Sequence, residues 1–359
     1  MNDIKFDCKY FCGVMPCKPN KEHNSECISC PFYTQIEKRI LIIKLGAMGD
    51  VVRTTPLLVK YREMYPNSEI SWLTDFPAVL PKDKIDKIYQ LNAVSLFVLQ
   101  NKQFDIAINL DKEEEACILL HTLKASEKYG FTWENNHIAP VNKAAEHKLI
   151  TGFFDGKSKA NKKHYIDEIF DICELPFNDE PCLLATSLEL SDKWKKILTT
   201  KAGNKTIVGL NTGCGSRWST RLWSDKNWEK LIDLIQSNNL FPVLLGGEQE
   251  NEKNLSLAAA TNCYYPGVYS LEEFFSITSA CDIVVTQVSM MMHVAIALKK
   301  KMVLMNNIFN KHEFYLYNNG TIVEPTIECE CYYGNTCKKG ESCMKYIEPD
   351  TVFEKILTL

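Results

Sequence analysis

Short apolar runs alternate with longer segments of helical periodicity along this sequence, and they do so in two blocks. The runs lie at 39–46, 69–75 and 104–111 in the first block and at 205–213, 241–247, 282–286 and 301–306 in the second. Apolar runs separated by about 10–15 residues of helical pattern indicate parallel strands joined by right-handed crossovers. Two such blocks predict an α/β protein with two doubly wound, Rossmann-like domains.

The 359 residues are enough for two domains of ordinary size. We expect a cysteine-rich segment at 1–35, an N-terminal domain at 36–178, a C-terminal domain at 188–345 and a C-terminal helix at 346–359. The stretch 176–190 is the expected link between the domains. The polar, Lys-rich stretch from 142 to 163 lacks a clear period, and we predict a mobile surface loop there.

Composition excludes several classes of protein. The formal charge of −4 gives no general attraction to nucleic acid. No segment approaches about 18 uninterrupted apolar residues, and the N-terminus lacks an apolar signal core, so we expect a soluble, cytoplasmic chain with no transmembrane segment. The glycine spacing of a dinucleotide-binding fingerprint is also absent, which weighs against a nicotinamide cofactor.

The stretch GAMGDVVRTTP follows the first apolar run. Thr55 suits a helix N-cap and Pro56 suits the first helical position, so we expect the next helix to begin there. Asp50 would then lie in the turn beyond the carboxyl end of a strand, where open α/β sheets bind ligands. Asp is also common in turns for purely local reasons, and the stretch alone leaves both interpretations open.

A glycine-rich loop at 211–224 follows the first strand of the second block. It leaves the strand through Gly213 and Gly215 and carries two cations, Arg217 and Arg221. Guanidinium groups and the unpaired N–H groups of the following helix suit a diphosphate. The alternative is a solvated basic loop.

Three further polar residues follow strands of the second block. Glu248 can accept hydrogen bonds from a ribose diol, although an acidic residue in the first turn of a helix is also favoured by the helix dipole. Ser289 can cap an apolar helix that carries His293, which on its own is more typical of a core histidine. If the two domains face one another, these residues and Asp50 line one cleft.

At these residues the chain resembles glycosyltransferase family 9, the heptosyltransferase family, from about Arg39 to the C-terminus. The resemblance is carried by ILIIKLGAMGDVVRTTPLL, LNTGCGSRWSTRLWSDKNW, PVLLGGEQE and the helix after Ser289. It implies a GT-B fold of two facing Rossmann-like domains. Lipopolysaccharide heptosyltransferases carry Asp-Ser/Thr-Gly before that helix, whereas this chain has Val288, Ser289 and Met290, which points to another branch of the family.

The resemblance implies inverting transfer of heptose or a related sugar from a nucleoside diphosphate, with ADP-heptose as the expected donor. The acceptor would be a hydroxyl of a glycan, a lipid-linked glycan or a protein. Asp50 would be the general base, and Arg221 would stand in the place of a donor-phosphate-binding Lys. Glu248 would hold the ribose, and Ser289 and His293 would belong to the donor-phosphate helix. We expect no metal in the catalytic step.

Cysteines gather at both ends of the chain. The C-terminal set is Cys329, Cys331, Cys337 and Cys343; the N-terminal set expected to bind is Cys8, Cys17, Cys27 and Cys30, with Cys12 and His23 nearby. Four thiolates suit structural zinc, iron or an iron–sulfur cluster, and one branch of the resembled family carries a cysteine-bound iron finger. Reduced thiols or disulfides are the alternatives.

Two other functions remain open from the sequence. One is a metal-bearing assembly or binding protein on a degenerate transferase scaffold, which the residues Val288 and Met290 favour. The other is a sugar-nucleotide epimerase, which would form product without an acceptor. Association with the periphery of the inner membrane and formation of homo-oligomers are both compatible with the sequence.

Overall fold

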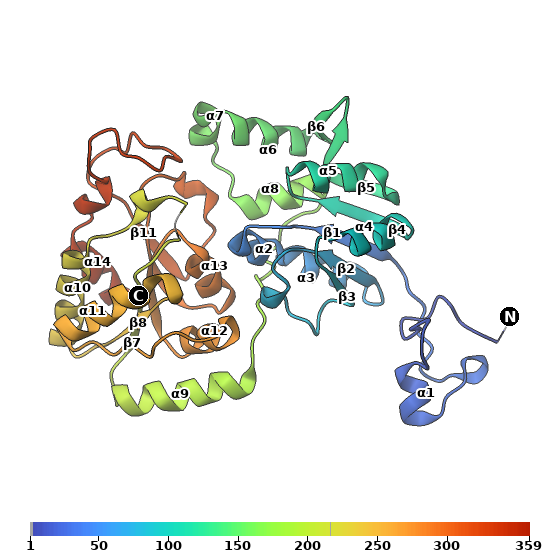
Figure 1. The fold of residues 1–359 in the computed structure, drawn as a ribbon, viewed down its shortest axis with the longest axis horizontal. Coiled ribbons are helices and arrows are strands. Elements are labelled where there is room, and N and C mark those ends of the chain that lie inside the picture. Colours follow the sequence, from blue (N-terminus) through green and yellow to red (C-terminus); the bar gives the residue numbers. More distant parts are fainter. Residues whose placement is uncertain (1–2, 216) are drawn as a thin grey trace.

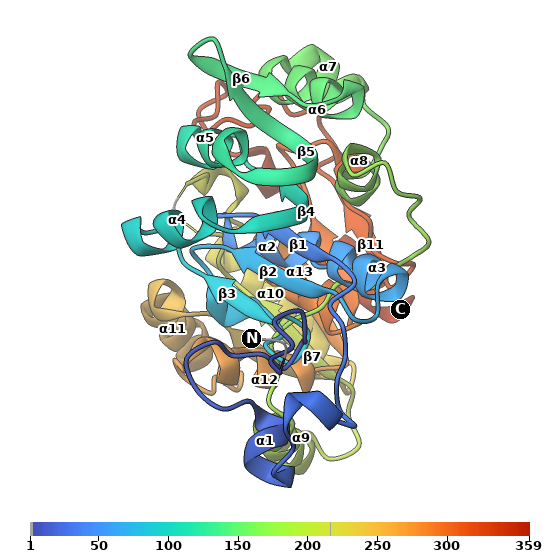
Figure 2. The same ribbon diagram turned by 90° about the vertical axis from the view of Figure 1, so that its right-hand side faces the viewer.

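The computed structural model describes residues 3–215 and 217–359, and this part of the chain forms two α/β lobes (Figure 1). The first two residues of the predicted cysteine-rich segment, and Ser216 of the predicted diphosphate loop, lie outside the described residues. The rest of the cysteine-rich segment, including α1 (Lys18–His23), projects away from the first lobe (Figures 1 and 2).

The first lobe is built on a six-stranded sheet in the order β3-β2-β1-β4-β5-β6. Its strands are β1 (Arg39–Ile43), β2 (Glu69–Leu73), β3 (Lys87–Tyr89), β4 (Gln103–Asn109), β5 (Lys124–Glu134) and β6 (His137–Pro140). All neighbours are parallel except β5 and β6. The side chains of β1 from Ile40 to Ile43 are fully buried, because this strand is covered on both faces.

The second lobe is built on a five-stranded sheet in the order β11-β10-β9-β7-β8, in which all neighbours are parallel. Its strands are β7 (Ile207–Asn211), β8 (Phe241–Leu245), β9 (Ile283–Gln287), β10 (Lys301–Met305) and β11 (Gly320–Val323). The two sheets, parallel except for the β5–β6 pair, confirm the predicted pair of doubly wound domains.

Helices cover the sheets of both lobes. In the first lobe they are α2 (Met48–Thr54), α3 (Pro56–Met64), α4 (Ala93–Gln100), α5 (Glu114–Thr122), α6 (Lys143–Phe153), α7 (Asp155–Ala160) and α8 (Tyr165–Ile172). In the second lobe they are α9 (Leu188–Ala202), α10 (Asp225–Ser237), α11 (Asn251–Thr261), α12 (Leu271–Ser279), α13 (Met290–Ala297) and α14 (Pro349–Leu357). The C-terminal helix α14 packs on α10 and belongs to the core of the second lobe.

The prediction of a turn between Gly46 and Pro56 was wrong, because α2 occupies most of it. Val51 and Val52 are fully buried, and this apolar pair favours a helix that begins at Met48. Pro56 does begin a helix, as expected, but this helix is α3. Asp50 therefore lies in the first turn of α2 rather than in a loop.

The prediction of a mobile loop from 142 to 163 was also wrong, since α6 and α7 form there. Asn142 caps α6 by accepting a hydrogen bond from the N–H of Ala145 at 2.9 Å. Ala145 and Leu149, four residues apart, bury one face of the helix. The many lysines of this stretch lie on the other faces and obscure the period.

The lobes meet along α2 and α13, which pack against each other (Figure 1). The chain crosses between them after α8 without regular structure until α9. This crossing is tied to α3, because the ammonium of Lys60 and the carboxylate of Glu180 form a buried ion pair at 2.9 Å. Among the described residues, no helix is both long enough and apolar enough to cross a bilayer.

Candidate active site

Asp50 lies at the junction of the lobes, in the first turn of α2. This helix begins shortly after the carboxyl end of β1. Its carboxylate lies 2.9 Å from the guanidinium of Arg53, and 32% of the side chain is exposed. Burial opposes the negative charge, but the nearby charges of Arg53 and Lys44 outweigh it, so the pKa of Asp50 lies below its ordinary value of 3.8. Asp50 is therefore a partly accessible, ionised carboxylate at neutral pH.

The position of Arg53 is fixed by an aromatic ring. Its guanidinium carbon lies 3.4 Å from the centroid of the Tyr165 ring on α8, and the ammonium of Lys148 lies 4.9 Å from the same centroid. A cation close to an aromatic ring is attracted to it, most strongly when the site is partly desolvated. This attraction holds Arg53 at the distance from which it pairs with Asp50.

A second ion pair lies behind Asp50 and is almost completely buried. Lys44 follows β1 and is 5% exposed, and its ammonium is bonded to the carboxylate of Asp111, which is 3% exposed and follows β4. The same carboxylate accepts a hydrogen bond from the N–H of Leu45. Removal of either charge would leave the other buried and unpaired, which costs about 3–5 kcal/mol. This pair was not predicted from the sequence, although Lys44 and Asp111 each lie near the end of an apolar run.

A cavity of about 570 Å³ lies between the lobes. The first lobe contributes charged residues of both signs to its wall: the cations Lys44, Arg53, Lys112 and Lys148 and the carboxylates Asp50, Asp111, Glu113 and Asp155. The second lobe contributes Arg217, Trp218, Glu313 and Tyr333. Of the residues predicted for the site, Asp50 and Arg217 share this cavity.

His293 meets the first lobe beside the catalytic candidate. A Cβ atom on Gly49 would lie 2.4 Å from Cδ2 of His293, so only glycine leaves room for the ring. Burial and the charge of Arg53 lower the pKa of His293 to about 3, which makes the imidazole neutral at physiological pH. His293 thus packs the two lobes together beside Asp50.

The predicted diphosphate loop joins several residues at the carboxyl edge of the second sheet. Asn211 donates a hydrogen bond to the carbonyl of Gly213 at 2.7 Å and contacts the hydroxyl of Ser289 at 3.4 Å. Ser289 caps α13 by accepting a hydrogen bond from the N–H of Met291 at 3.3 Å. The loop and the N-terminus of α13 therefore lie side by side. Gly215 has a φ of 74°, which favours glycine at that position.

The sequence predicts that Arg221 and Glu248 line the same cleft as Asp50, but the structure places both elsewhere. Arg221 is 6% exposed, and its guanidinium donates to the carbonyls of Val288 and Cys214. Glu248 is exposed at the start of a short helical turn after β8. Neither side chain lines the cavity between the lobes.

A second glutamate lies closer to the glycine loop than Glu248 does. A Cβ atom on Gly213 would lie 2.0 Å from a carboxylate oxygen of Glu250, and the other oxygen accepts a hydrogen bond from the N–H of Gly247 at 2.9 Å. The sequence analysis missed Glu250, because only the folded loop brings Gly213 next to it. Lys112, Lys148, Glu313 and Tyr333 were missed for the same reason.

The cysteines at the two ends of the chain differ in their contacts. At the C-terminus, the thiol of Cys329 contacts those of Cys343 and Cys331, and the thiol of Cys331 also contacts that of Cys337. Cys331 and Cys343 are buried. The N-terminal thiols of Cys8, Cys17, Cys27 and Cys30 are partly exposed. Within the described residues, no three His, Cys, Asp or Glu side chains converge as metal ligands.

The sequence of the chain matches a known protein family. Residues 97–324 match the model of glycosyltransferase family 9 (heptosyltransferase). The lipopolysaccharide core heptosyltransferase OpsX of Haemophilus influenzae is 33% identical over 113 residues, which cover 28% of this chain and 32% of that relative. The match therefore spans about a third of the curated relative.

Two solved structures have the same fold. A family 9 glycosyltransferase from Veillonella parvula has a TM-score of 0.71 at 19% identity, with 90% of this chain and 98% of that one covered. The ADP-heptose heptosyltransferase II of E. coli has a TM-score of 0.64 at 16% identity, with 89% and 98% covered. Because the family model matches more than half of the sequence, the chain belongs to glycosyltransferase family 9, the heptosyltransferase family, and has its GT-B fold.

Proposed function

We propose that this chain is an inverting glycosyltransferase. It transfers heptose or a related sugar from a nucleoside diphosphate, with ADP-heptose as the expected donor, to a hydroxyl of a glycan, lipid-linked or protein acceptor. The observation that carries the proposal is the ionised carboxylate of Asp50 in the cavity between the lobes. The opposite wall of this cavity holds Arg217 of the glycine-rich loop 211–224, here called the donor loop. Family membership and the heptosyltransferase activity of the relatives support it.

In the proposed reaction, Asp50 accepts the proton of the acceptor hydroxyl as that oxygen bonds to the anomeric carbon. The bond from the anomeric carbon to the phosphate oxygen breaks on the opposite face, which inverts the configuration. Arg217 and the N–H groups at the start of α13, beside Ser289, stabilise the departing diphosphate. These fixed positive groups of the protein stabilise the negative charge of the leaving diphosphate.

The donor is proposed to bind along the carboxyl edge of the second sheet. Gly213 and Gly215 let the backbone approach the phosphates, and Arg221 holds the loop through its bonds to Val288 and Cys214. The exposed carboxylate of Glu248 is the proposed ligand of the ribose diol.

The acceptor is proposed to carry an anionic group, because a lysine faces its side of the cavity. The amine of Lys112 donates to the carbonyl of Lys148 at 3.3 Å and lies against Gly152, where a Cβ atom would be 2.0 Å away. Burial and the neighbouring charge of Lys148 lower the pKa of Lys112 to about 8. Among the described residues, no carboxylate forms an ion pair with the ammonium of Lys112. A partly desolvated ammonium of this kind suits a carboxylate or phosphate of the acceptor.

The first prediction concerns Asp50→Asn, which removes the base and keeps the shape of the side chain. We expect the rate of sugar transfer to fall about 10²–10⁴-fold, because a well-placed general base contributes that much. The measurement is turnover with ADP-heptose and candidate acceptors. Binding of ADP, followed by calorimetry, should be unchanged.

Asp83→Asn is the matched control, since Asp83 is an exposed carboxylate far from the cavity lining. It should transfer sugar at the wild-type rate. Near-normal turnover by Asp50→Asn would remove Asp50 from the mechanism. A wild-type protein that transfers sugar from no nucleotide donor would instead favour the assembly or binding protein.

The second prediction concerns Lys112→Ala. We expect the acceptor KM to rise at least about 10-fold with an anionic acceptor, because a charge-assisted hydrogen bond contributes about 1.5–3 kcal/mol. The donor KM should not change. Because the ammonium is charged only below its pKa, acceptor affinity in the wild type should fall as the pH rises through about 8.

Two variants of this region sharpen the test. Lys112→Arg keeps the charge and should retain most of the affinity, whereas Gly152→Ala should displace the amine and raise the acceptor KM. An unchanged acceptor KM in both Lys112→Ala and Gly152→Ala would contradict the anionic-acceptor proposal.

We further propose that the C-terminal cysteines hold structural zinc or iron, alone or in an iron–sulfur cluster. The support is that each of the four thiols contacts at least one other thiol of the set. Two of the four are buried. Thiolate ligands suit these metals, and binding would contribute to folding of the segment. The bound metal would have no part in the transfer step.

The third prediction is therefore about one equivalent of zinc or of single iron per chain, or about two or four of iron if a cluster forms, in protein purified without oxygen and measured by elemental analysis. Cys331→Ser should lower this value, and Cys12→Ser, an exposed thiol outside the proposed sets, should not. A second equivalent of zinc, or of iron without sulfide, would support the N-terminal set. Metal well below one equivalent would contradict both sites.

A further inference from the structure

Asn310 of the second lobe is bonded to the first lobe through both hydrogens of its amide. Its Nδ2 donates to the carbonyl of Ser158 at 2.8 Å and to that of Asn161 at 2.7 Å. Both carbonyls belong to the end of α7, where helix carbonyls are short of partners; that of Ser158 also accepts from the N–H of the C-cap residue Asn161 at 3.1 Å. Asn310 is 8% exposed, so these bonds are shielded from water. The second lobe thus satisfies the end of a helix of the first.

Tyr332 makes another contact with the same short helix. Its hydroxyl and that of Ser158 are hydrogen-bonded at 2.8 Å, and the ammonium of Lys159 lies 4.9 Å from the centre of its ring. Tyr332 belongs to the cysteine-rich segment 329–343. Two separate segments of the second lobe therefore meet on α7.

The segments that hold α7 also form one wall of the cavity. The hydroxyl of Tyr333, next to Tyr332, donates to both carboxylate oxygens of Glu313 at 2.8 Å. The N–H of Tyr333 donates to the carbonyl of Ile308 at 3.0 Å. Thr220 in the donor loop donates to the carbonyl of Gly334 at 2.8 Å. A shift of these segments away from α7 would therefore move the cavity wall and the donor loop together.

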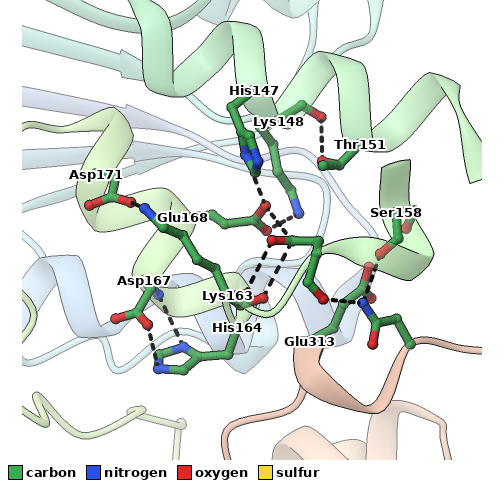
Figure 3. Close-up of polar contacts among 12 residues, drawn as sticks. His147, Lys148, Thr151, Ser158, Lys163, His164, Asp167, Glu168, Asp171 and Glu313 are labelled. Carbon is green, nitrogen blue, oxygen red and sulfur yellow. Dashed lines mark hydrogen bonds and ion pairs between the residues drawn. The ribbon is translucent and has the colours of Figure 1, made fainter. Parts of the chain in front are cut away.

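On the first lobe, the contacts reach the cavity through a buried carboxylate. Glu168 on α8 is 3% exposed, accepts a hydrogen bond from Asn161 at 3.0 Å and pairs with the ammonium of Lys148. Lys148 itself lines the cavity. Figure 3 shows Lys148, Ser158 and Glu168 on the helices of the first lobe and Glu313 on the facing segment of the second.

We propose that α7, Asn310 and Tyr332 form an interdomain latch, and that Asn310 and Tyr332 are positioning residues. The latch holds the lobes at the separation at which the donor side of the second lobe faces Asp50. Domain closure of this kind assembles the reacting groups and excludes water. Loss of the latch would shift the population towards more open forms. The kinetic consequence rests on the proposed transferase function, whereas the structural consequence does not.

The test uses the full chain with Asn310→Asp combined with Tyr332→Phe. Asn310→Asp keeps the oxygen that accepts from the N–H of His312 at 3.1 Å but removes both donors and sets a carboxylate against two carbonyls. Tyr332→Phe keeps the ring and loses the hydroxyl. By small-angle X-ray scattering, we expect a larger radius of gyration than in the wild type without ligand.

The matched control combines Asn238→Asp with Tyr346→Phe. Asn238 donates only within its own lobe, to the carbonyl of Leu234 at 2.8 Å, and Tyr346 is an exposed tyrosine just beyond the cysteine-rich segment. The control should keep the wild-type radius of gyration and transfer rate.

The kinetic readout separates positioning from folding. For the latch variant we expect kcat to fall on the order of 10-fold as the competent closed form becomes less populated. The dissociation constant for ADP should stay at its wild-type value, because the proposed donor site lies wholly in the second lobe. An unchanged radius of gyration, or a loss of ADP affinity as large as the loss of kcat, would overturn the latch. If the wild type transfers no sugar, the proposed function fails, and the scattering result still decides the latch.

Discussion

The ion pair between Asp50 and Arg53 is the interaction on which the site depends. Arg53 lies on the Tyr165 ring of the same lobe, and the pair sits where α2 meets α13 of the other lobe. Burial alone would raise the pKa of a carboxylate in this place. With Arg53 and Lys44 beside it, Asp50 stays ionised and partly accessible. In the proposed reaction the first lobe thus supplies a charged base, and the second lobe binds the donor beside it.

The two lobes divide the chemistry between them. The first lobe combines Asp50 with cations that face the proposed acceptor, among them Lys112 and Lys148. The second lobe sets a glycine loop beside the N-terminus of α13, an arrangement suited to phosphates. Glycine allows close approach at three places, since Gly49 admits His293, Gly152 admits Lys112 and Gly213 admits Glu250. The cysteine-rich segment, remote in sequence, is part of the cavity wall through Tyr333.

The sequence predicted the parallel sheets because buried strands are continuous apolar runs, as in β1. It placed Asp50 at a strand end but in a turn, because Pro56 predicts a helix start and the apolar pair Val51 and Val52 is too short a pattern to predict α2. The helices between 142 and 163 were missed because lysines cover their exposed faces. Glu250 and Lys112 could not be found from the sequence, because their roles come from contacts with glycines distant along the chain.

The pH dependence of kcat/KM tests the central claim most directly, because it reports the ionisation of the base in the free enzyme. A base is active when deprotonated, and the pKa of Asp50 lies below 3.8, so activity should be lost only as the pH falls through that low range. The account predicts a level profile from neutrality down to about pH 5. A loss of activity centred near 6.5, the ordinary pKa of histidine, that disappears in His293→Gln would contradict it and make His293 the base.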